Sequence, residues 1–81
     1  MRVTIRLFAS QREAVGMSCI EADLPTAATA ADAFAHTCAR HPKLNHAAQS
    51  TAFAVNRRHV GPGTVLCDGD EVSFLPPVAG G

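Results

Sequence analysis

At 81 residues the chain is one domain, near the lower size at which one hydrophobic core sustains independent folding. Seven Lys and Arg balance seven Asp and Glu, so a general electrostatic hold on nucleic acid or on an anionic membrane is not supported. The sequence shows no signal-peptide core and no apolar run near the about 20 residues of a membrane span, so we expect a cytoplasmic protein with neither as a partner.

The cysteines and histidines show no pattern of a metal or disulfide site. The cysteines are Cys19, Cys38 and Cys67. Their odd number and the lack of a C-x-x-C spacing argue against a disulfide framework or a zinc knuckle, so we interpret them as reduced, mostly buried thiols. His36, His41 and His46 are five residues apart, which turns each away from the one before it on a helix. We therefore expect no metal site.

Residues 2–8 alternate as a strand that is covered on one face. The apolar side carries Val3, Ile5 and Leu7, and the polar side carries Arg2, Thr4 and Arg6. Continuing this period places the large ring of Phe8 on the polar side. Such a ring either folds back under a loop or is an exposed contact for a partner, and the pattern favours neither.

A short helix and a second strand follow. Ser10 and Glu13 have the spacing of a capping box, and Gly16 suits a left-handed helix end. Residues 17–24 return to a weak alternation, which predicts a strand that pairs with the first as a hairpin and ends at Pro25. We expect its covered side to carry Cys19 and Ala22, opposite Glu21 and Asp23.

Residues 29–40 are predicted to form the main helix, which a proline ends two residues later. Thr29 and Asp32 match a variant of the capping box. One stripe at three- and four-residue spacing consists of Ala30, Ala33, Phe34, Thr37, Cys38 and His41. The stripe is small apart from Phe34, so we expect it to approach a sheet closely, with Phe34 as the chief anchor. Residues 43–50 are expected to be an irregular crossing.

A third strand and a hairpin are predicted next. The strand covers residues 51–55, and the turn at residues 56–58 leads into a brief strand at residues 59–60, which Gly61-Pro62-Gly63 breaks. The basic cluster Arg57-Arg58-His59 at the hairpin tip is either a site for an anion or partner or, more commonly for such clusters, solvated surface.

The last strand covers residues 71–75 and follows a turn at Asp68-Gly69-Asp70. In that turn we expect positive φ at Gly69 and a hydrogen bond from the backbone ahead to the Asp68 carboxylate. Alternation places Val72 and Phe74 on one face and Ser73 and Leu75 on the other. Leu75 is thus a second apolar residue on a polar face. If the first and last strands are neighbours, Phe8 and Leu75 form one exposed patch.

A tail over residues 76–81 is expected to follow a domain over residues 1–75. Its residues are Pro76, Pro77, Val78, Ala79, Gly80 and Gly81. The diproline favours an extended arm with a reduced ordering cost, and the final glycines lack Cβ atoms, so a narrow channel can close around the backbone. A Gly-rich end without function is the alternative, although a diproline directly after a strand argues against it.

The order β-β-α-β-β-β in so short a chain predicts an α+β fold, a ubiquitin-like β-grasp. In this fold a mixed sheet of four to five strands packs on one main helix. To close the sheet, the first and last strands should pair in parallel, with the helix in a right-handed crossover.

Three blocks of the sequence resemble one family. They are Leu7-Phe8-Ala9 with Arg12-Glu13 and Gly16, the Val55-Asn56 turn, and the final DGDEVSFLPPVAGG at residues 68–81. Together they are similar to the small, sulfur-carrying subunit of molybdopterin synthase. The sulfur carriers of thiamine synthesis share the fold, the DGD turn and the Gly-Gly end. They are typically shorter and lack both the helix after the first strand and the Pro-Pro-Val run.

The resemblance implies a chemistry at the Gly81 carboxylate. An ATP-dependent adenylyltransferase of the ubiquitin-activating type makes an acyl adenylate there, and a sulfur donor converts it to a thiocarboxylate. The sulfur then passes to a pterin precursor in the large synthase subunit, where it forms the dithiolene. The small subunit binds no cofactor, since ATP is used by the activating partner. The catalytic side chains are expected on the large subunit, in a heterotetramer.

The resemblance also implies a docking surface for the partner. The family's hydrophobic interface maps onto Phe8, His59 and Leu75, where His59 replaces the usual aliphatic residue. Val78 is expected to plug the entrance of the partner's channel. Arg12 matches a family arginine that pairs with the partner, and an ordinary surface arginine is an equal alternative.

Three other functions remain open from the sequence. The first is a sulfur carrier for thiamine or another metabolite. The second is a ubiquitin-like modifier that is joined to lysines through Gly81, and the third is a plain interaction domain.

Overall fold

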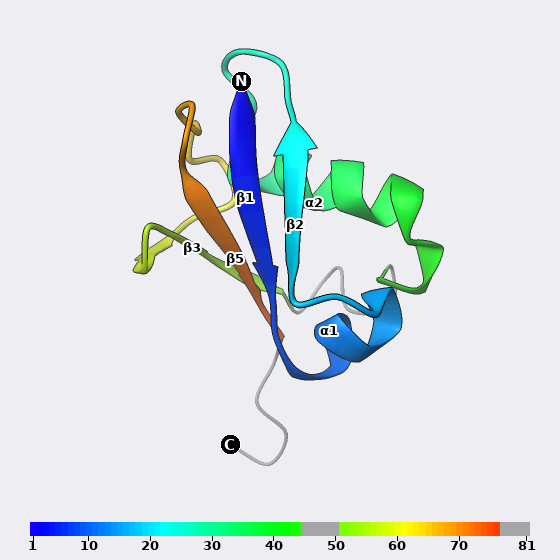
Figure 1. The fold of residues 1–81 in the computed structure, drawn as a ribbon. Coiled ribbons are helices and arrows are strands. Elements are labelled where there is room, and N and C mark those ends of the chain that lie inside the picture. Colours follow the sequence, from blue (N-terminus) through cyan, green and yellow to red (C-terminus); the bar gives the residue numbers. More distant parts are fainter. Residues whose placement is uncertain (45–50, 77–81) are drawn as a thin grey trace.

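The computed structural model describes residues 1–44 and 51–76 of the 81-residue chain. The elements in order are β1 (Arg2–Leu7), α1 (Ala9–Val15), β2 (Cys19–Asp23), α2 (Ala30–Arg40), β3 (Ala52–Val55), β4 (Arg58–Val60) and β5 (Glu71–Leu75). The strands form one mixed sheet in the order β2-β1-β5-β3-β4, and α2 passes behind it in Figure 1. No helix of the described ranges is long and apolar enough to cross a membrane.

The predicted parallel pairing of the first and last strands is confirmed. β1 runs parallel to β5, with Leu7 opposite Phe74, while the other three strand pairs are antiparallel. This central pair brings the two ends of the sequence together in the sheet. The α+β architecture predicted from the sequence, a mixed sheet on one main helix, is therefore the observed one.

The main helix begins at a complete capping box, as predicted. The Thr29 backbone N–H donates to Asp32 Oδ2 over 2.9 Å, and the Asp32 N–H donates to Thr29 Oγ1 over 3.2 Å. These bonds satisfy two backbone donors that the first turn leaves free. The buried residues of the helix are Ala30, Ala33, Phe34, Thr37 and Cys38. They belong to the predicted stripe, which therefore faces the core.

Three aromatic rings join α2 to the sheet. Phe34 lies edge-on to Phe74, with ring centroids 5.0 Å apart, and to Phe53, with centroids 6.1 Å apart. Such edge-to-face contacts add about 0.5–1.5 kcal/mol to the burial of the rings. Phe34 is thus the anchor that the sequence predicted. Leu44, in the region expected to be irregular, is also part of the core at 1% exposure.

The capping box predicted at Ser10 and Glu13 is wrong. The helix α1 has Phe8 as its N-cap, without a side-chain capping bond. The chain reverses directly after β1, where Ala9 has a φ of 50°, and the Gln11 N–H already donates to the Phe8 carbonyl over 3.1 Å. Ser10 therefore lies inside the first turn and not ahead of it. The predicted left-handed end at Gly16 is confirmed, with a φ of 85°.

The expected orientation of β2 is also wrong in part. Ala22 is buried as predicted, but Cys19 is exposed and Ile20 lies on the covered side. Residues three apart on a strand point to opposite faces, so Cys19 and Ala22 cannot share one. Cys67 is exposed too, so of the three thiols only Cys38 is buried. Burial raises the pKa of the Cys38 thiol.

The turn before β5 ties the two central strands together. Gly69 has a φ of 85°, as predicted. The Asp68 carboxylate, however, accepts from the Arg2 backbone N–H over 2.8 Å and not from the chain ahead of it. The reason is the parallel pairing, which places the first residue of β1 beside this turn. Asp70 instead closes the turn by accepting from the Cys67 N–H over 2.8 Å.

Candidate functional site

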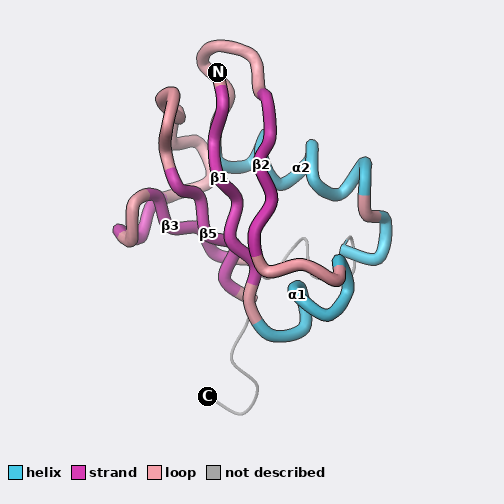
Figure 2. Tube along the Cα trace, in the orientation of Figure 1, coloured by secondary structure: helices cyan, strands magenta, loops and turns pink. Residues whose placement is uncertain are grey.

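The face of the sheet opposite α2 is called here the outer face. It carries the alternate residues of every strand that point away from the core. In Figure 2 the two central strands β1 and β5 end at the same edge of the sheet, the lower one in that view. Pro76, the last described residue, directly follows β5 and is half-buried. The part of the outer face at this edge therefore surrounds the root of residues 76–81.

An apolar row lies at that edge and consists of Phe8, Leu75 and Ala52. Phe8 has an extended backbone, with φ −133° and ψ 152°, so its side chain continues the alternation of β1 onto the outer face. Because Leu7 is opposite Phe74, Phe8 comes beside Leu75, and Leu75 is in turn paired with Ala52. Phe8 is 38% exposed, although it is a large apolar residue. The register thus places Phe8 beside the half-buried Leu75, as the alternation predicted, and their role as a contact for a partner stays a prediction.

A buried side-chain amide connects α1 to the strand β3 near this edge of the sheet. The Gln11 side chain on α1 is 1% exposed, and its Nε2 donates to Thr51 Oγ1 over 2.9 Å. This bond joins α1 to the residue that precedes β3, across 40 positions of sequence. It fixes the helix whose N-cap is Phe8, and therefore the position of the Phe8 ring beside the sheet.

The next row of residues across the strands of the outer face has small side chains in the middle and larger polar side chains at its ends. Its register joins Arg6 to Ser73, Ser73 to Ala54, and Ala54 to His59. Ser73 and Ala54 are each 6% exposed, and their small side chains leave the surface lower there than at their larger neighbours. Arg6 Nη1 lies 3.7 Å from Glu71 Oε2, one row further on.

The far end of the outer face is ionic. Arg2 Nε donates to Asp23 Oδ1 over 3.1 Å, and Arg2 Nη1 lies 3.6 Å from Glu21 Oε2. The hydrogen bond from Arg2, followed by its charge, holds the pKa of Asp23 below its ordinary value, and the same bond raises the pKa of Arg2. The outer face thus changes from apolar at the root of residues 76–81 to charged at the opposite end.

The structure brings together some of the predicted site residues. Phe8 and Leu75 are neighbours, whereas His59 lies exposed on β4, two strands and two residue positions from Leu75 and hence about 12 Å away. Arg12 is exposed on α1, outside the rows of the sheet. Pro77, Val78, Ala79, Gly80 and Gly81 lie outside the described residues, so their roles stay predictions.

Sequence reasoning missed Arg6, Ser73 and Ala54 as parts of this surface. The signal for Arg6 was present, because the alternation of the first strand puts it on the same side as Phe8. The same holds for Ser73, which alternation puts on the side of Leu75. For Ala54 the missing information was the register between strands about 20 residues apart in the sequence. Within residues 1–44 and 51–76, no three His, Cys, Asp or Glu side chains come together as a candidate metal site.

Comparisons with known proteins identify the family of the chain. A model of the ThiS family matches residues 5–81. A relative from Chlamydomonas reinhardtii, named molybdopterin synthase sulfur carrier subunit, is 35% identical over 83 residues and covers 100% of both chains.

Solved structures give the same result. A putative molybdopterin converting factor, subunit 1, from Pyrococcus furiosus superposes with a TM-score of 0.85 at 30% identity, over 96% of this chain and 99% of that one. SAMP1 from Haloferax volcanii, a small archaeal modifier protein, superposes with a TM-score of 0.88 at 26% identity, over 100% of both chains. The fold is therefore the ubiquitin-like β-grasp, and the chain belongs to the ThiS family as a sulfur carrier of the molybdopterin synthase type.

Proposed function

We propose that the chain carries sulfur as a thiocarboxylate on Gly81 and delivers it, in the cytoplasm, to a pterin precursor held by the large subunit of molybdopterin synthase. The observation that carries this proposal is the family relationship, which extends through residue 81 and so includes the Gly-Gly end. The apolar row beside Pro76 supports it, because a partner that takes up residues 76–81 has a surface to dock on at their root.

The chemistry starts from a poor electrophile. A C-terminal carboxylate is ionised at neutral pH and must first be activated. An adenylyltransferase joins the Gly81 carboxylate to the α-phosphate of ATP and releases pyrophosphate. A sulfur nucleophile then attacks the acyl carbon and displaces AMP, which leaves a thiocarboxylate. When that sulfur bonds to the pterin precursor, water cleaves the acyl–sulfur bond and restores the carboxylate. A dithiolene requires this transfer twice.

The reach of residues 76–81 fits such a transfer. Six residues span at most about 20 Å when extended, which is enough to enter a buried site while the domain stays outside. The chain then contributes the reactive carboxylate and the docking surface. The groups that bind the pterin and move protons belong to the large subunit, so this chain is a consumed and regenerated donor.

Mass spectrometry tests the proposal directly. The protein is incubated with ATP, the adenylyltransferase and a sulfur source, and its mass is expected to rise by the difference between one sulfur and one oxygen atom. Deletion of Gly81 should abolish the change, whereas Arg57→Ala, at the exposed hairpin tip, should keep it. An unchanged mass for the intact chain, or full activity without Gly81, would refute the proposal.

A protein modifier is the second candidate, and the high similarity to the small archaeal modifier SAMP1 favours it. In that case an acceptor lysine, and not a sulfur nucleophile, displaces AMP from Gly81. Bands of higher mass that survive thiol reductant would indicate isopeptide conjugates. A thiocarboxylate that converts the pterin precursor, without such bands, would favour molybdopterin synthesis and would also separate it from a role in thiamine synthesis.

A further inference from the structure

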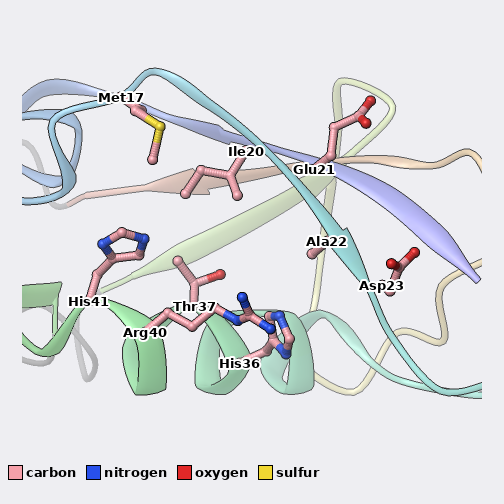
Figure 3. Close-up of a pocket in the computed structure, with 9 residues that line it drawn as sticks. All are labelled: Met17, Ile20, Glu21, Ala22, Asp23, His36, Thr37, Arg40 and His41. Atoms are coloured by element: carbon pink, nitrogen blue, oxygen red, sulfur yellow. The ribbon is translucent and has the colours of Figure 1, made fainter.

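A groove on the other side of the molecule has no part in the proposed sulfur transfer. It lies between β2 and α2, has a volume of about 300 Å³, and is called here the β2–α2 groove. Figure 3 shows Ile20 and Thr37 facing each other across its middle, with Met17 and His41 at one end. Met17 is 46% exposed, so a large apolar side chain lies open to solvent beside the groove.

The groove runs along a free strand edge. In the described sheet β2 pairs only with β1. Leu24 donates to the Met1 carbonyl over 2.8 Å, and Leu7 donates to the Ser18 carbonyl over 2.9 Å. Hydrogen-bonded pairs alternate along an antiparallel ladder, so the even-numbered residues of β2 bond to β1. The N–H and C=O groups of Cys19, Glu21 and Asp23 are therefore directed outward.

Two charged residues, Glu21 and Asp23, lie on this edge, but it has neither the shortness nor the proline that also protect edge strands. β2 is a regular five-residue strand without proline, whereas the opposite edge strand, β4, has three residues and is followed by Gly61-Pro62-Gly63. Five residues of strand are about 17 Å long, which is sufficient to pair with a segment of similar length.

The wall of the groove formed by α2 carries one positive charge, that of Arg40. Arg40, His36 and His41 line it, and within the described residues none of them has an ion pair. The carboxylates on the β2 side are already engaged, because Arg2 contacts both Asp23 and Glu21. In Figure 3 Glu21 points away from the helix. The positive charge that α2 presents to an occupant is therefore that of Arg40, which also acts on Asp23 across the groove.

We propose that the β2–α2 groove binds an extended, acidic segment of a partner protein, which adds to the edge of β2 as a further strand. Its backbone pairs with Cys19, Glu21 and Asp23. Apolar side chains on its inner side lie against Met17 and Ile20, and acidic ones meet the wall of α2. Main-chain bonds supply affinity in this mode of recognition, and the pockets for alternate side chains supply specificity.

The groove is separate from the apolar row of the outer face. The apolar row belongs to β5, β3 and the end of β1, whereas the groove is formed by β2 and α2. A partner in the groove therefore leaves Phe8 and Leu75 free. Because the two surfaces are independent, variants in the groove are expected to keep full sulfur transfer.

Two seven-residue peptides provide the probes. One reads Val-Thr-Val-Thr-Asp-Thr-Asp and the other is its reverse, so that both strand directions are covered. Their controls carry Lys in place of Asp. Titration into ¹⁵N-labelled protein should shift the amide signals of Cys19, Glu21, Asp23 and α2, and leave those of Phe8 and Ser73 unchanged. One acidic peptide is expected to bind at least about tenfold more tightly than its Lys control.

Charge reversal gives the decisive comparison. Arg40→Glu should invert the preference between acidic and basic peptides, and Met17→Asp should weaken both. Arg57→Glu, an exposed reversal on the β3–β4 hairpin, should change neither. The proposal is overturned if neither acidic peptide shifts the β2 amides at millimolar concentration, or if the shifts fall on the outer face. Shifts at β2 that depend on protein concentration alone would assign the edge to a second copy of the chain and would also overturn it.

Discussion

Phe8 is the residue that most clearly separates a binding role from a structural one. It is 38% exposed and lies beside Leu75, so its ring contributes little to the core. We expect Phe8→Ser to weaken binding of the large synthase subunit by about tenfold or more, as for a buried aromatic anchor of an interface. Its melting temperature should stay close to that of the wild type. Titration calorimetry and a thermal melt measure the two effects.

Met17→Ser is the matched control for this variant, because Met17 is similarly exposed but lies outside the outer face. It should bind the large subunit normally. Equal losses in both variants would mean that the outer face is not the docking surface.

Asp23 gives a prediction about acid stability. Its pKa is lowered from the ordinary value of 3.8, mainly by the hydrogen bond from Arg2 and then by the charge of Arg2. A carboxylate with a depressed folded-state pKa stabilises the fold above its unfolded pKa, and this contribution disappears as the pH falls through the folded value. Asp23→Asn should therefore melt slightly lower than the wild type at pH 6; the difference should begin to shrink near pH 3.8 and vanish once the pH is below the lowered folded-state pKa.

Melting curves of both proteins between pH 2 and 7 test this. Both partners are exposed, so the effect is small and should shrink further in salt. A gap in melting temperature that widens on acidification would contradict the assignment.

Among the elements, the β3–β4 hairpin depends on an unusual turn. Asn56 and Arg57 both have positive φ, 51° and 68°, as in the two-residue turns that suit the twist of a hairpin. Asn56 also bonds to its surroundings, because its Nδ2 donates to Asp70 Oδ1 and its Oδ1 accepts from the Glu71 N–H, each over 3.0 Å. The turn is therefore attached to the start of β5.

Two substitutions in this turn should act in opposite directions. Arg57→Gly removes the strain of a left-handed residue and should raise the free energy of unfolding by up to about 1 kcal/mol. Asn56→Ala loses two side-chain bonds and should lower it by about 1–2 kcal/mol. Urea denaturation measures both. A loss of stability in Arg57→Gly would show that the arginine side chain, and not the backbone, determines stability at this position.

The anchor of α2 gives a larger effect. Phe34 contacts the rings of Phe53 and Phe74 and is 7% exposed. Truncation to Ala leaves a cavity between helix and sheet, so Phe34→Ala should cost about 3–5 kcal/mol, and Phe34→Leu clearly less. The exposed Ala35→Ser, on the opposite side of the helix, is the control. Equal unfolding free energies for Phe34→Ala and this control would mean that α2 is not held by the aromatic cluster.

The same elements show how far sequence alone could lead. Alternation in the first and last strands correctly placed Phe8 and Leu75 on the outer face, because period two depends only on neighbouring residues. The start of α1 was missed, since the reversal at Ala9 has no sequence signature of its own. The row from Arg6 to His59 could not be found, because it depends on the register between strands that are distant in the chain.

For the molecule as a whole, the two proposed binding surfaces differ in chemistry. The outer face is apolar near Pro76 and ionic at the far end, whereas the β2–α2 groove carries Arg40 along its helix. The first surface lies at the root of residues 76–81 and the second does not. Partners that use Gly81 and partners that use the groove should therefore be independent of each other.

Partners that both use Gly81, in contrast, should exclude each other. At most about 20 Å separates Pro76 from Gly81, so any enzyme that acts on this carboxylate must sit close to the apolar row. We expect the adenylyltransferase and the large synthase subunit to compete for the chain, and Leu75→Asp to weaken both. Surface plasmon resonance with the Cys19→Ser variant immobilised through Cys67, an exposed thiol away from this edge, tests the competition. A stable ternary complex would show that the two enzymes approach Gly81 from different sides. Competition for this surface would then not determine which of the two enzymes binds the chain at each step of sulfur transfer.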